Sequence, residues 1–417
     1  MKKLVIFSLI FFLIQHNTQG QDSLFAKKMC DTLSSKSFFG RGYINDGHKK
    51  ASAFIAKEFK SYKLKSFEKN NYFQYFPIEF NTFPSISLSI NGKQLTEGRD
   101  YIVSPESRTA KGTFETMAVD TNHVEMPLRY ANKCAVFDFE NHNNKKISAL
   151  YNDLKVIQQT SNTPTMEIKD KLTWWIRPVQ TPFGDSKPHF IVKRSVFNEL
   201  DSLKSIEYNI KSKILVDKSQ NIIGFVEGTT FPDSFLVIAA HYDHLGMLGN
   251  AVFYGANDNA SGVAMLLDLA KTYSKKPAKY SVVFMAFGGE EAGLLGSKYF
   301  VEQALFPLKN IKFLVNLDLL GTGEDGLMVV NGTAHNTLFK RLETINQQDS
   351  STALKKIGKR PNAPNSDHFW FTQKGVPAFF FYAMGNYTHY HDIDDKAVAM
   401  TEYNKIFRLI DTFIRSF

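Results

Sequence analysis

The second half of the chain alternates short apolar runs with amphipathic stretches of helical periodicity. The runs are rich in Val, Ile, Leu and Phe and have no polar face, which is typical of strands buried on both sides. Strands that alternate with helices form βαβ units. We therefore predict a mixed, mostly parallel α/β sheet flanked by helices. The predicted strands are Phe235–Ala240, Ser281–Phe287, Phe313–Leu317, Leu327–Val330 and Pro377–Tyr382, and the predicted helices are Gly262–Tyr273, Leu294–Ala304, Asn336–Gln347, Phe369–Gln373 and Thr401–Ile414.

The part of the chain before this alternation changes character at about residue 86. From there to about residue 206, short alternating runs and turn sequences replace the longer helical pattern. Structureless loops of that length are uncommon inside a compact domain. We therefore predict an inserted β-rich domain over 86–206, within a main domain made of residues 21–85 and 207–417. The expected elements outside the alternating region are a helix over His48–Tyr62 and strands over Tyr72–Phe80, Ile86–Ile90, Ala135–Phe139, Asn209–Val216 and Asn221–Val226.

The first twenty residues have the pattern of a secretory signal peptide. Lys2 and Lys3 precede an apolar run over Leu4–Leu13, and small or polar residues follow. The run is too short to cross a bilayer as a helix, and cleavage is expected after Gly20. The alternative is an uncleaved anchor. We expect an exported protein, periplasmic or secreted, with no stable membrane insertion after cleavage.

Charge and composition narrow the class of partner. The chain is 43% hydrophobic and 22% charged, with a formal net charge of +9 spread thinly along 417 residues. This is a globular composition, and no run reaches the five or six like charges of a nucleic-acid arm. We expect no nucleic-acid partner, and the sequence leaves the oligomeric state open.

Cys30 and Cys134 are the two cysteines of the sequence. An oxidising compartment would permit a disulfide between them, provided that their α carbons lie within about 7 Å. Two buried free thiols are the alternative. Neither cysteine has neighbours at the spacing of a metal site.

Imidazole and carboxylate side chains follow the predicted strands of the second half. Open α/β sheets bind ligands beyond the carboxyl ends of their strands, so these groups are expected to converge at one edge. Each fragment alone is weak evidence, since an isolated strand-end acid is commonly a cap. Together they predict a metal site. The candidate groups are His241, Asp243 and His244 after the first of these strands, Asp258 in the loop that follows, the pair Glu290-Glu291, Asp318 and His391.

Two imidazoles and three carboxylates suit zinc, with cobalt or manganese as substitutes. One zinc takes about three protein ligands and leaves a position for water, so five side chains can hold two ions if one carboxylate bridges. One member of the Glu290-Glu291 pair could then ligate while the other acts as the acid/base for the attacking water. Asp243 lies two residues after His241, and on a strand the two would share a face. We expect Asp243 to orient that imidazole.

These fragments resemble the co-catalytic zinc aminopeptidases, exopeptidases with a phosphorylase/hydrolase-like α/β fold. The resemblance covers most of 21–85 and 207–417, and a looser one to a protease-associated domain covers the insert. It implies two zinc ions per chain, bridged by Asp258, with Glu290 as general acid/base and Tyr390 as a donor to the tetrahedral oxyanion. It also implies a cis peptide between Asp258 and Asn259. The sequence strings that carry it are AAHYDHLG, GANDNASG, FGGEEAGLLGS, NLDLLG and YHDIDD.

The resemblance assigns the ligands to two zinc ions. His241, Asp258 and Asp318 would hold one zinc, and Asp258, Glu291 and His391 would hold the other. Peptides with a free N-terminus are the implied substrates. His389 is a rival to His391, but it lacks the preceding tyrosine and the aspartate four residues later.

Three other functions remain open at this level. A glutaminyl cyclase shares much of the motif order but uses one zinc, and the string DNASG favours the hydrolase version. A non-catalytic binding protein on the same scaffold would be expected to lose ligands. A carboxypeptidase or dipeptidase differs in pocket residues that no short motif records. A serine hydrolase would need a GxSxG elbow, which the chain lacks.

Overall fold

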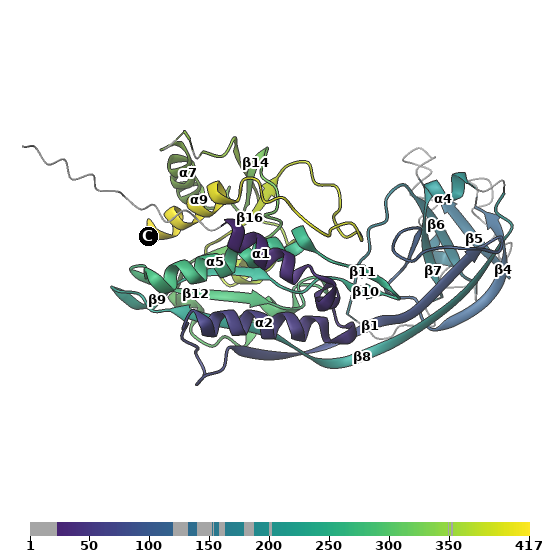
Figure 1. The fold of residues 1–417 in the computed structure, drawn as a ribbon, viewed down its shortest axis with the longest axis horizontal. Helices are drawn as coiled ribbons and strands as arrows, with labels where there is room; N and C mark the ends of the chain where they lie inside the picture. Colours follow the sequence, from purple (N-terminus) through teal and green to yellow (C-terminus); the bar gives the residue numbers. More distant parts are fainter. Residues whose placement is uncertain are drawn as a thin grey trace, which may run out of the picture.

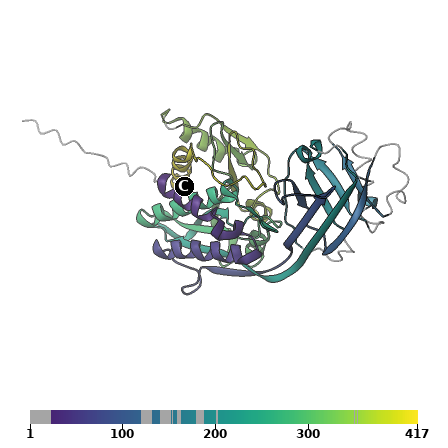
Figure 2. The same ribbon diagram turned by 45° about the vertical axis from the view of Figure 1, so that its right-hand side comes forward.

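The computed structural model describes residues 23–119, 132–139, 152, 154–157, 163–178, 187–199, 202–348, 350–351 and 353–417. The predicted signal peptide lies outside these residues. Two lobes are joined by a pair of long antiparallel strands, β1 (Phe73–Ile90) and β8 (Ser205–Val226) (Figures 1 and 2). Within the described part of the chain, no helix is long and apolar enough to cross a membrane.

The larger lobe is built on a mixed, mostly parallel sheet, as predicted. β9, β12, β13 and β16 are parallel, whereas β8 and β14 run antiparallel to their neighbours at the two sides of this parallel group. The strand order is β15-β14-β16-β13-β9-β12-β8. The bounds are β9 (Phe231–His241), β12 (Tyr280–Phe287), β13 (Ile311–Leu317), β14 (Gly326–Val330), β15 (Ile357–Arg360) and β16 (Ala378–Met384).

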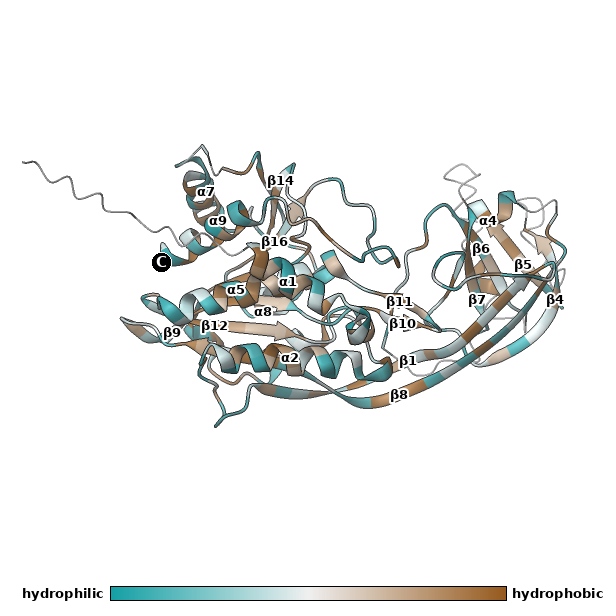
Figure 3. Ribbon diagram, in the orientation of Figure 1, coloured by the Kyte–Doolittle hydropathy of each residue, from teal (hydrophilic) through white to brown (hydrophobic). Residues whose placement is uncertain are grey.

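Helices cover both faces of this sheet, which explains why its central strands are mostly apolar (Figure 3). Along β9, Leu236 and Ile238 pack in one core, while Val237 and Ala239 pack in the core of the opposite face. The first core includes residues of α1, α2, α5, α7 and α9, and the second includes residues of α6 and α8. The bounds are α1 (Ser23–Leu33), α2 (Gly47–Ser61), α5 (Gly262–Lys275), α6 (Leu295–Glu302), α7 (Asn336–Gln347), α8 (His368–Gln373) and α9 (Tyr403–Arg415).

The smaller lobe contains the strands between residues 93 and 193. It also contains the far ends of β1 and β8, and β4 pairs with this end of β8. The lobe includes a helix, α4 (Arg194–Asn198). β4, β5, β6 and β7 form parallel pairs. The strands are β2 (Lys93–Gln94), β3 (Tyr101–Val103), β4 (Ala110–Ala118), β5 (Lys133–Asp138), β6 (Thr165–Lys169) and β7 (His189–Lys193).

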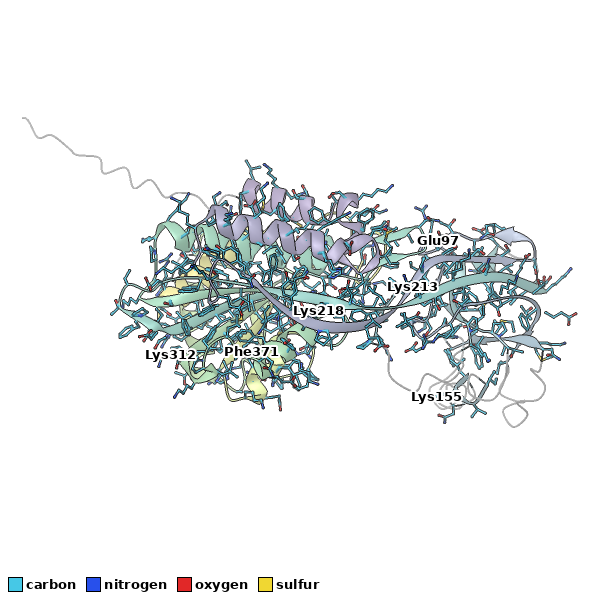
Figure 4. The ribbon with its side chains drawn as sticks, turned by 90° about the horizontal axis from the view of Figure 1, so that it is seen from below. Glu97, Lys155, Lys213, Lys218, Lys312 and Phe371 are labelled. Atoms are coloured by element: carbon cyan, nitrogen blue, oxygen red, sulfur yellow. The ribbon has the colours of Figure 1, made fainter. Side chains whose placement is uncertain are left out.

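The long strands correct two predictions. We expected a break between Tyr72–Phe80 and Ile86–Ile90, but β1 is continuous, with a register shift between Thr82 and Ser85. The predicted strand pair over Asn209–Val216 and Asn221–Val226 is also wrong, because both segments belong to β8. Figure 4 shows β8 crossing between the lobes, with Lys213 and Lys218 along it. Two short strands, β10 (Gly246–Leu248) and β11 (Ala251–Phe253), pair beside the crossing, where β10 meets β1.

Both cysteines are buried and free. Cys30 is a core-facing residue of α1, and Cys134 lies on β5 in the core of the smaller lobe. The structure therefore corresponds to the alternative of two buried thiols.

Candidate metal centre

The structure brings the five predicted ligands together at the carboxyl edge of the parallel sheet. His241 is the last residue of β9, and Asp318 directly follows β13. Asp258 lies in the turn before α5, Glu291 follows β12, and His391 lies in the segment after β16. All five side chains are buried. Neighbouring parallel strands end at the same edge of the sheet, which explains why residues up to 150 positions apart in sequence meet here.

The five side chains form two groups that share Asp258. His241 Nε2 lies 3.3 Å from Asp258 Oδ1 and 3.3 Å from Asp318 Oδ1. His391 Nε2 lies 3.2 Å from Asp258 Oδ2 and 3.1 Å from Glu291 Oε2. Each imidazole thus faces two carboxylates, and the two oxygens of Asp258 point to different imidazoles.

The hydrogen bonds of His391 indicate that a cation belongs in this site. Its Nδ1 lies 2.9 Å from the carbonyl oxygen of Trp174 and therefore donates a proton to it. In a neutral ring, Nε2 then carries a lone pair. This nitrogen faces two carboxylates and has no hydrogen-bond partner. Such an arrangement needs a positive charge between the groups.

The spacing fits zinc. Two ligands at about 2.0–2.1 Å from a tetrahedral zinc lie about 3.3 Å apart, close to the four nitrogen–oxygen distances above. Nitrogen and carboxylate oxygen are also donor types that zinc accepts. His241, Asp258 and Asp318 would hold one ion, and Asp258, Glu291 and His391 the other.

The pKa directions reflect a buried excess of acids. Burial raises the pKa of Glu290 well above its usual range, and Glu291, Asp367 and Asp318 add to this, although His241 opposes it. Burial would also raise the pKa of Glu291, but His391 and His244 outweigh it and hold that pKa at about 2. Burial raises the pKa of Asp367 to about 7. A cation would relieve the repulsion among these carboxylates.

Glu290 lies beside the first group. One atom each of His241, Glu290 and Asp318 lie within 4.8 Å of one another, and so do atoms of His241, Asp258 and Glu291. The main-chain N–H of Glu290 donates to Asp243 Oδ1 at 3.1 Å. The side chain is therefore close enough to the candidate metal ligands to act on a molecule bound there.

Asp243 differs from its predicted placement. β9 ends at His241, so Asp243 lies beyond the strand and the shared-face argument does not apply. Its carboxylate is 3.8 Å from His241 Nδ1, whereas its carbonyl oxygen is 3.2 Å away and accepts the proton. The main chain of Asp243 orients the imidazole, and the carboxylate accepts from Glu290 and from the Tyr43 hydroxyl at 3.3 Å.

Tyr390 and His389 occupy different surroundings. The Tyr390 ring stacks on His391 with centroids 3.9 Å apart, and 38% of the residue is exposed. Burial and nearby Asp258 raise the pKa of Tyr390, so the hydroxyl keeps its proton. His389 instead contacts Asp392 at 3.2 Å and is not among the five clustered side chains.

Three further residues support this centre. His244 Nδ1 lies 2.6 Å from Glu291 Oε1. Asp395 accepts the main-chain N–H groups of Asn257 at 2.8 Å and of Asp258 at 3.1 Å, which fixes the turn around the shared ligand. His244 lies in the string HYDH and Asp395 in the string YHDIDD, so their proximity in sequence to the candidate ligands indicates a supporting role for both.

Arg41 had no local sequence pattern to reveal it. The side chain is fully buried, and Gly42 beside it passes so close to the main chain of Gly246 that an added Cβ would lie 2.3 Å from its Cα. The guanidinium thereby reaches the inside of the turn before α5. It donates to five carbonyl oxygens, those of Leu33, Tyr242, Tyr254, Gly255 and Asp258.

Residues 221–415 match the sequence model of peptidase family M28. This range contains all five clustered side chains and Glu290. This part of the chain is therefore similar to peptidase family M28. The Asp258–Asn259 peptide is also cis, as the resemblance implied.

Two named relatives are similar to this chain in sequence. Aminopeptidase YwaD of Bacillus subtilis is 32% identical over 182 residues, which are 42% of this chain and 38% of that protein. A probable zinc metalloprotease of Pyrenophora tritici-repentis is 36% identical over 112 residues, 25% of each chain. This chain therefore spans well under two thirds of the length of these curated relatives.

Two solved structures share this fold over nearly the whole chain. A zinc aminopeptidase from Bacillus subtilis superposes with a TM-score of 0.69 at 19% identity and covers 95% of both chains. A peptidase M28 precursor from Shewanella amazonensis gives a TM-score of 0.71 at 15% identity, covering 94% of this chain and 93% of that one. At these identities the likeness concerns the fold, including its mixed sheet.

Proposed function

We propose that this protein is an exported metallo-aminopeptidase that removes N-terminal residues from peptides at a two-zinc centre. The observation that carries the proposal is the sharing of Asp258, whose two oxygens face His241 at 3.3 Å and His391 at 3.2 Å. Side chains that point in this way can serve two adjacent ions. Relatives named as aminopeptidase and zinc metalloprotease support the class of reaction.

The protein groups divide the work of peptide hydrolysis. Paired zinc ions, when bound, polarise the scissile carbonyl and activate a water. Glu290 takes a proton from that water and passes it to the leaving amine. Burial, which raises the pKa of Glu290, makes its carboxylate a stronger base than an exposed one. Tyr390 keeps its hydroxyl proton and can donate a hydrogen bond to the developing oxyanion.

The decisive experiment combines zinc content with hydrolysis of aminoacyl-nitroanilides for the wild type, Glu290→Gln and the exposed control Glu302→Gln. We expect two zinc ions per chain in all three proteins. Activity should be lost in Glu290→Gln, by a factor of at least about 10², and retained in the control. A zinc-loaded wild type that cleaves none of these substrates would contradict the proposal.

The same measurement separates the main alternatives. About one zinc per chain, together with cyclisation of peptides that begin with Gln, would favour a glutaminyl cyclase. Two zinc ions without aminopeptidase activity would favour a carboxypeptidase or dipeptidase. Export is tested separately, by expressing the full chain and sequencing the N-terminus of the protein found outside the cytoplasm. A mature protein that begins directly after Gly20 is expected.

A further inference from the structure

A short segment of the insert, Trp174–Trp175, reaches the candidate metal centre. The Trp174 carbonyl accepts the proton of His391 Nδ1 at 2.9 Å, and its N–H donates to the His391 carbonyl at 3.0 Å. The Trp174 ring is buried against Phe253, with centroids 4.8 Å apart, and its Nε1–H donates to the Val103 carbonyl at 3.0 Å. This segment is therefore anchored on both sides, to the insert and to a candidate metal ligand.

The next side chain, Trp175, lies beside the candidate ligand His391. Its ring lies 4.3 Å from the His391 ring and 6.0 Å from the Tyr390 ring, centroid to centroid, at steep angles to both. It is 43% exposed, beside Tyr390 at 38%. These are two of the few large hydrophobic residues exposed among the described residues, and they meet at the same imidazole. An exposed apolar pair of this kind commonly marks a binding surface.

Open space adjoins the ring. Trp175 also lines a pocket of about 240 Å³, whose other walls include Glu106, Glu167 and Arg177 of the insert. The indole therefore keeps a free face although its neighbour Trp174 is immobilised. A rigid aromatic residue with a free face offers a large contact area at low cost in conformational entropy.

We propose that Trp175 contacts the substrate and selects for an apolar side chain on its N-terminal residue. The inference rests on the proposed aminopeptidase function. The residue whose carbonyl is attacked carries its side chain on the adjacent carbon, so that side chain lies near the metal ligands. Trp175 touches one of these ligands, and Tyr390 extends the same aromatic surface. The insert would thus form one wall of the substrate site.

The test compares Trp175→Ala with the conservative Trp175→Phe and with Phe231→Ala. Phe231 is a suitable control because it is 46% exposed and lies at the start of β9, at the opposite end of the strand from His241. Activity is measured on Leu-, Phe- and Ala-nitroanilides, which share one leaving group. Equilibrium binding of phenylalaninol and alaninol, which have no scissile bond, provides a readout independent of turnover. Zinc content is measured for every variant.

We expect Trp175→Ala to reduce the preference for Phe and Leu over Ala by about 10- to 100-fold, mainly through KM. Its Kd for phenylalaninol should rise by a similar factor, while the Kd for alaninol stays within about twofold. Trp175→Phe should recover most of the preference, and Phe231→Ala should match the wild type.

Two results would overturn the inference while leaving the proposed function intact. One is an unchanged Phe/Ala ratio and an unchanged phenylalaninol Kd in Trp175→Ala. The other is loss of zinc from Trp175→Ala, which would mean that the ring supports His391 and does not select substrate. An inactive, zinc-loaded wild type would instead refute the aminopeptidase proposal, and this inference with it.

Discussion

His244 Nδ1 lies 2.6 Å from Glu291 Oε1, while the other oxygen of that carboxylate faces His391 at 3.1 Å. The His244 imidazole thus fixes one oxygen of the Glu291 carboxylate, and the other oxygen is directed toward the candidate metal centre. Such supporting hydrogen bonds fix the orientation of a ligand, and their removal typically weakens metal binding by about 10- to 100-fold.

We therefore expect His244→Ala to weaken zinc binding by about 10- to 100-fold, and to do so without unfolding the protein. Competition with a fluorescent chelator measures this directly. His335→Ala is the control, because His335 packs on Phe313 and Phe379, away from the five clustered side chains. Equal affinity in His244→Ala and the control would show that His244 does not position Glu291.

The residues at the strand ends could be predicted from sequence because they depend on one local rule. A buried strand followed by His, Asp or Glu places that side chain at the carboxyl edge of the sheet, as His241 and Asp318 illustrate. The supporting contacts could not be predicted in this way. Arg41 and Asp258 are 217 positions apart, and so are His391 and Trp174. No periodic pattern in sequence records such a pairing.

The long strands were missed for a different reason. The stretch of β8 around residues 212–218 crosses between the lobes, where most of its side chains are exposed. Its polar composition, including Asp217 and Lys218, therefore resembles a turn between two strands. Pairing with β1 keeps this stretch extended, and that pairing partner lies more than a hundred residues earlier in the chain.

The two candidate metal positions should respond differently to single substitutions. Asp258→Asn changes the residue shared by both groups, whereas His391→Ala affects one group. We expect zinc content to fall toward zero in Asp258→Asn and toward one ion per chain in His391→Ala, measured by mass spectrometry of the metal after gel filtration. Asp325→Asn, a change at an exposed acid paired with Lys355, should leave the content unchanged. Equal zinc loss in Asp258→Asn and His391→Ala would argue against a bridging Asp258.

Arg41→Lys should destabilise the fold. The guanidinium serves five carbonyl oxygens, and an ammonium has only three protons. At least two buried acceptors lose their donor, each at a cost of about 1–3 kcal/mol. We expect the free energy of unfolding to fall by about 2–6 kcal/mol, measured by urea denaturation with chelator present. Arg99→Lys, at an exposed position, is the control, and a similar small change in both variants would contradict the prediction.

Both thiols should be inert in the native protein. Burial raises the pKa of Cys30 to about 12, with Arg41 opposing the shift, and burial also raises the pKa of Cys134. At pH 8 only about one Cys30 in 10⁴ would be the reactive thiolate. We expect no reaction with an aromatic disulfide reagent in the native state, and two thiols per chain in denaturant without reductant. No thiols in denaturant would reveal a disulfide.

His368 should make stability depend on pH in a defined window. The side chain is buried at the start of α8, where Nε2 contacts Asn362 Oδ1 at 3.0 Å and Nδ1 has no hydrogen-bond partner. Burial lowers the pKa of His368 from 6.5 to about 4, and the Ser366 main chain opposes this slightly. Between these two pH values the unfolded chain binds a proton that the native protein does not. The contribution to stability is therefore complete above pH 6.5 and decreases as the pH falls toward 4.

One titrating group contributes a slope of at most about 1.4 kcal/mol per pH unit in that window. Other buried acids near the centre also titrate, so the informative quantity is the difference between the wild type and His368→Gln. Glutamine can still donate to Asn362 but does not ionise. In chelator, the free energy of unfolding should fall more steeply from pH 6.5 to 4.5 in the wild type, by about 1 kcal/mol per unit. Parallel curves would mean that His368 is protonated in the native protein as readily as in the unfolded chain.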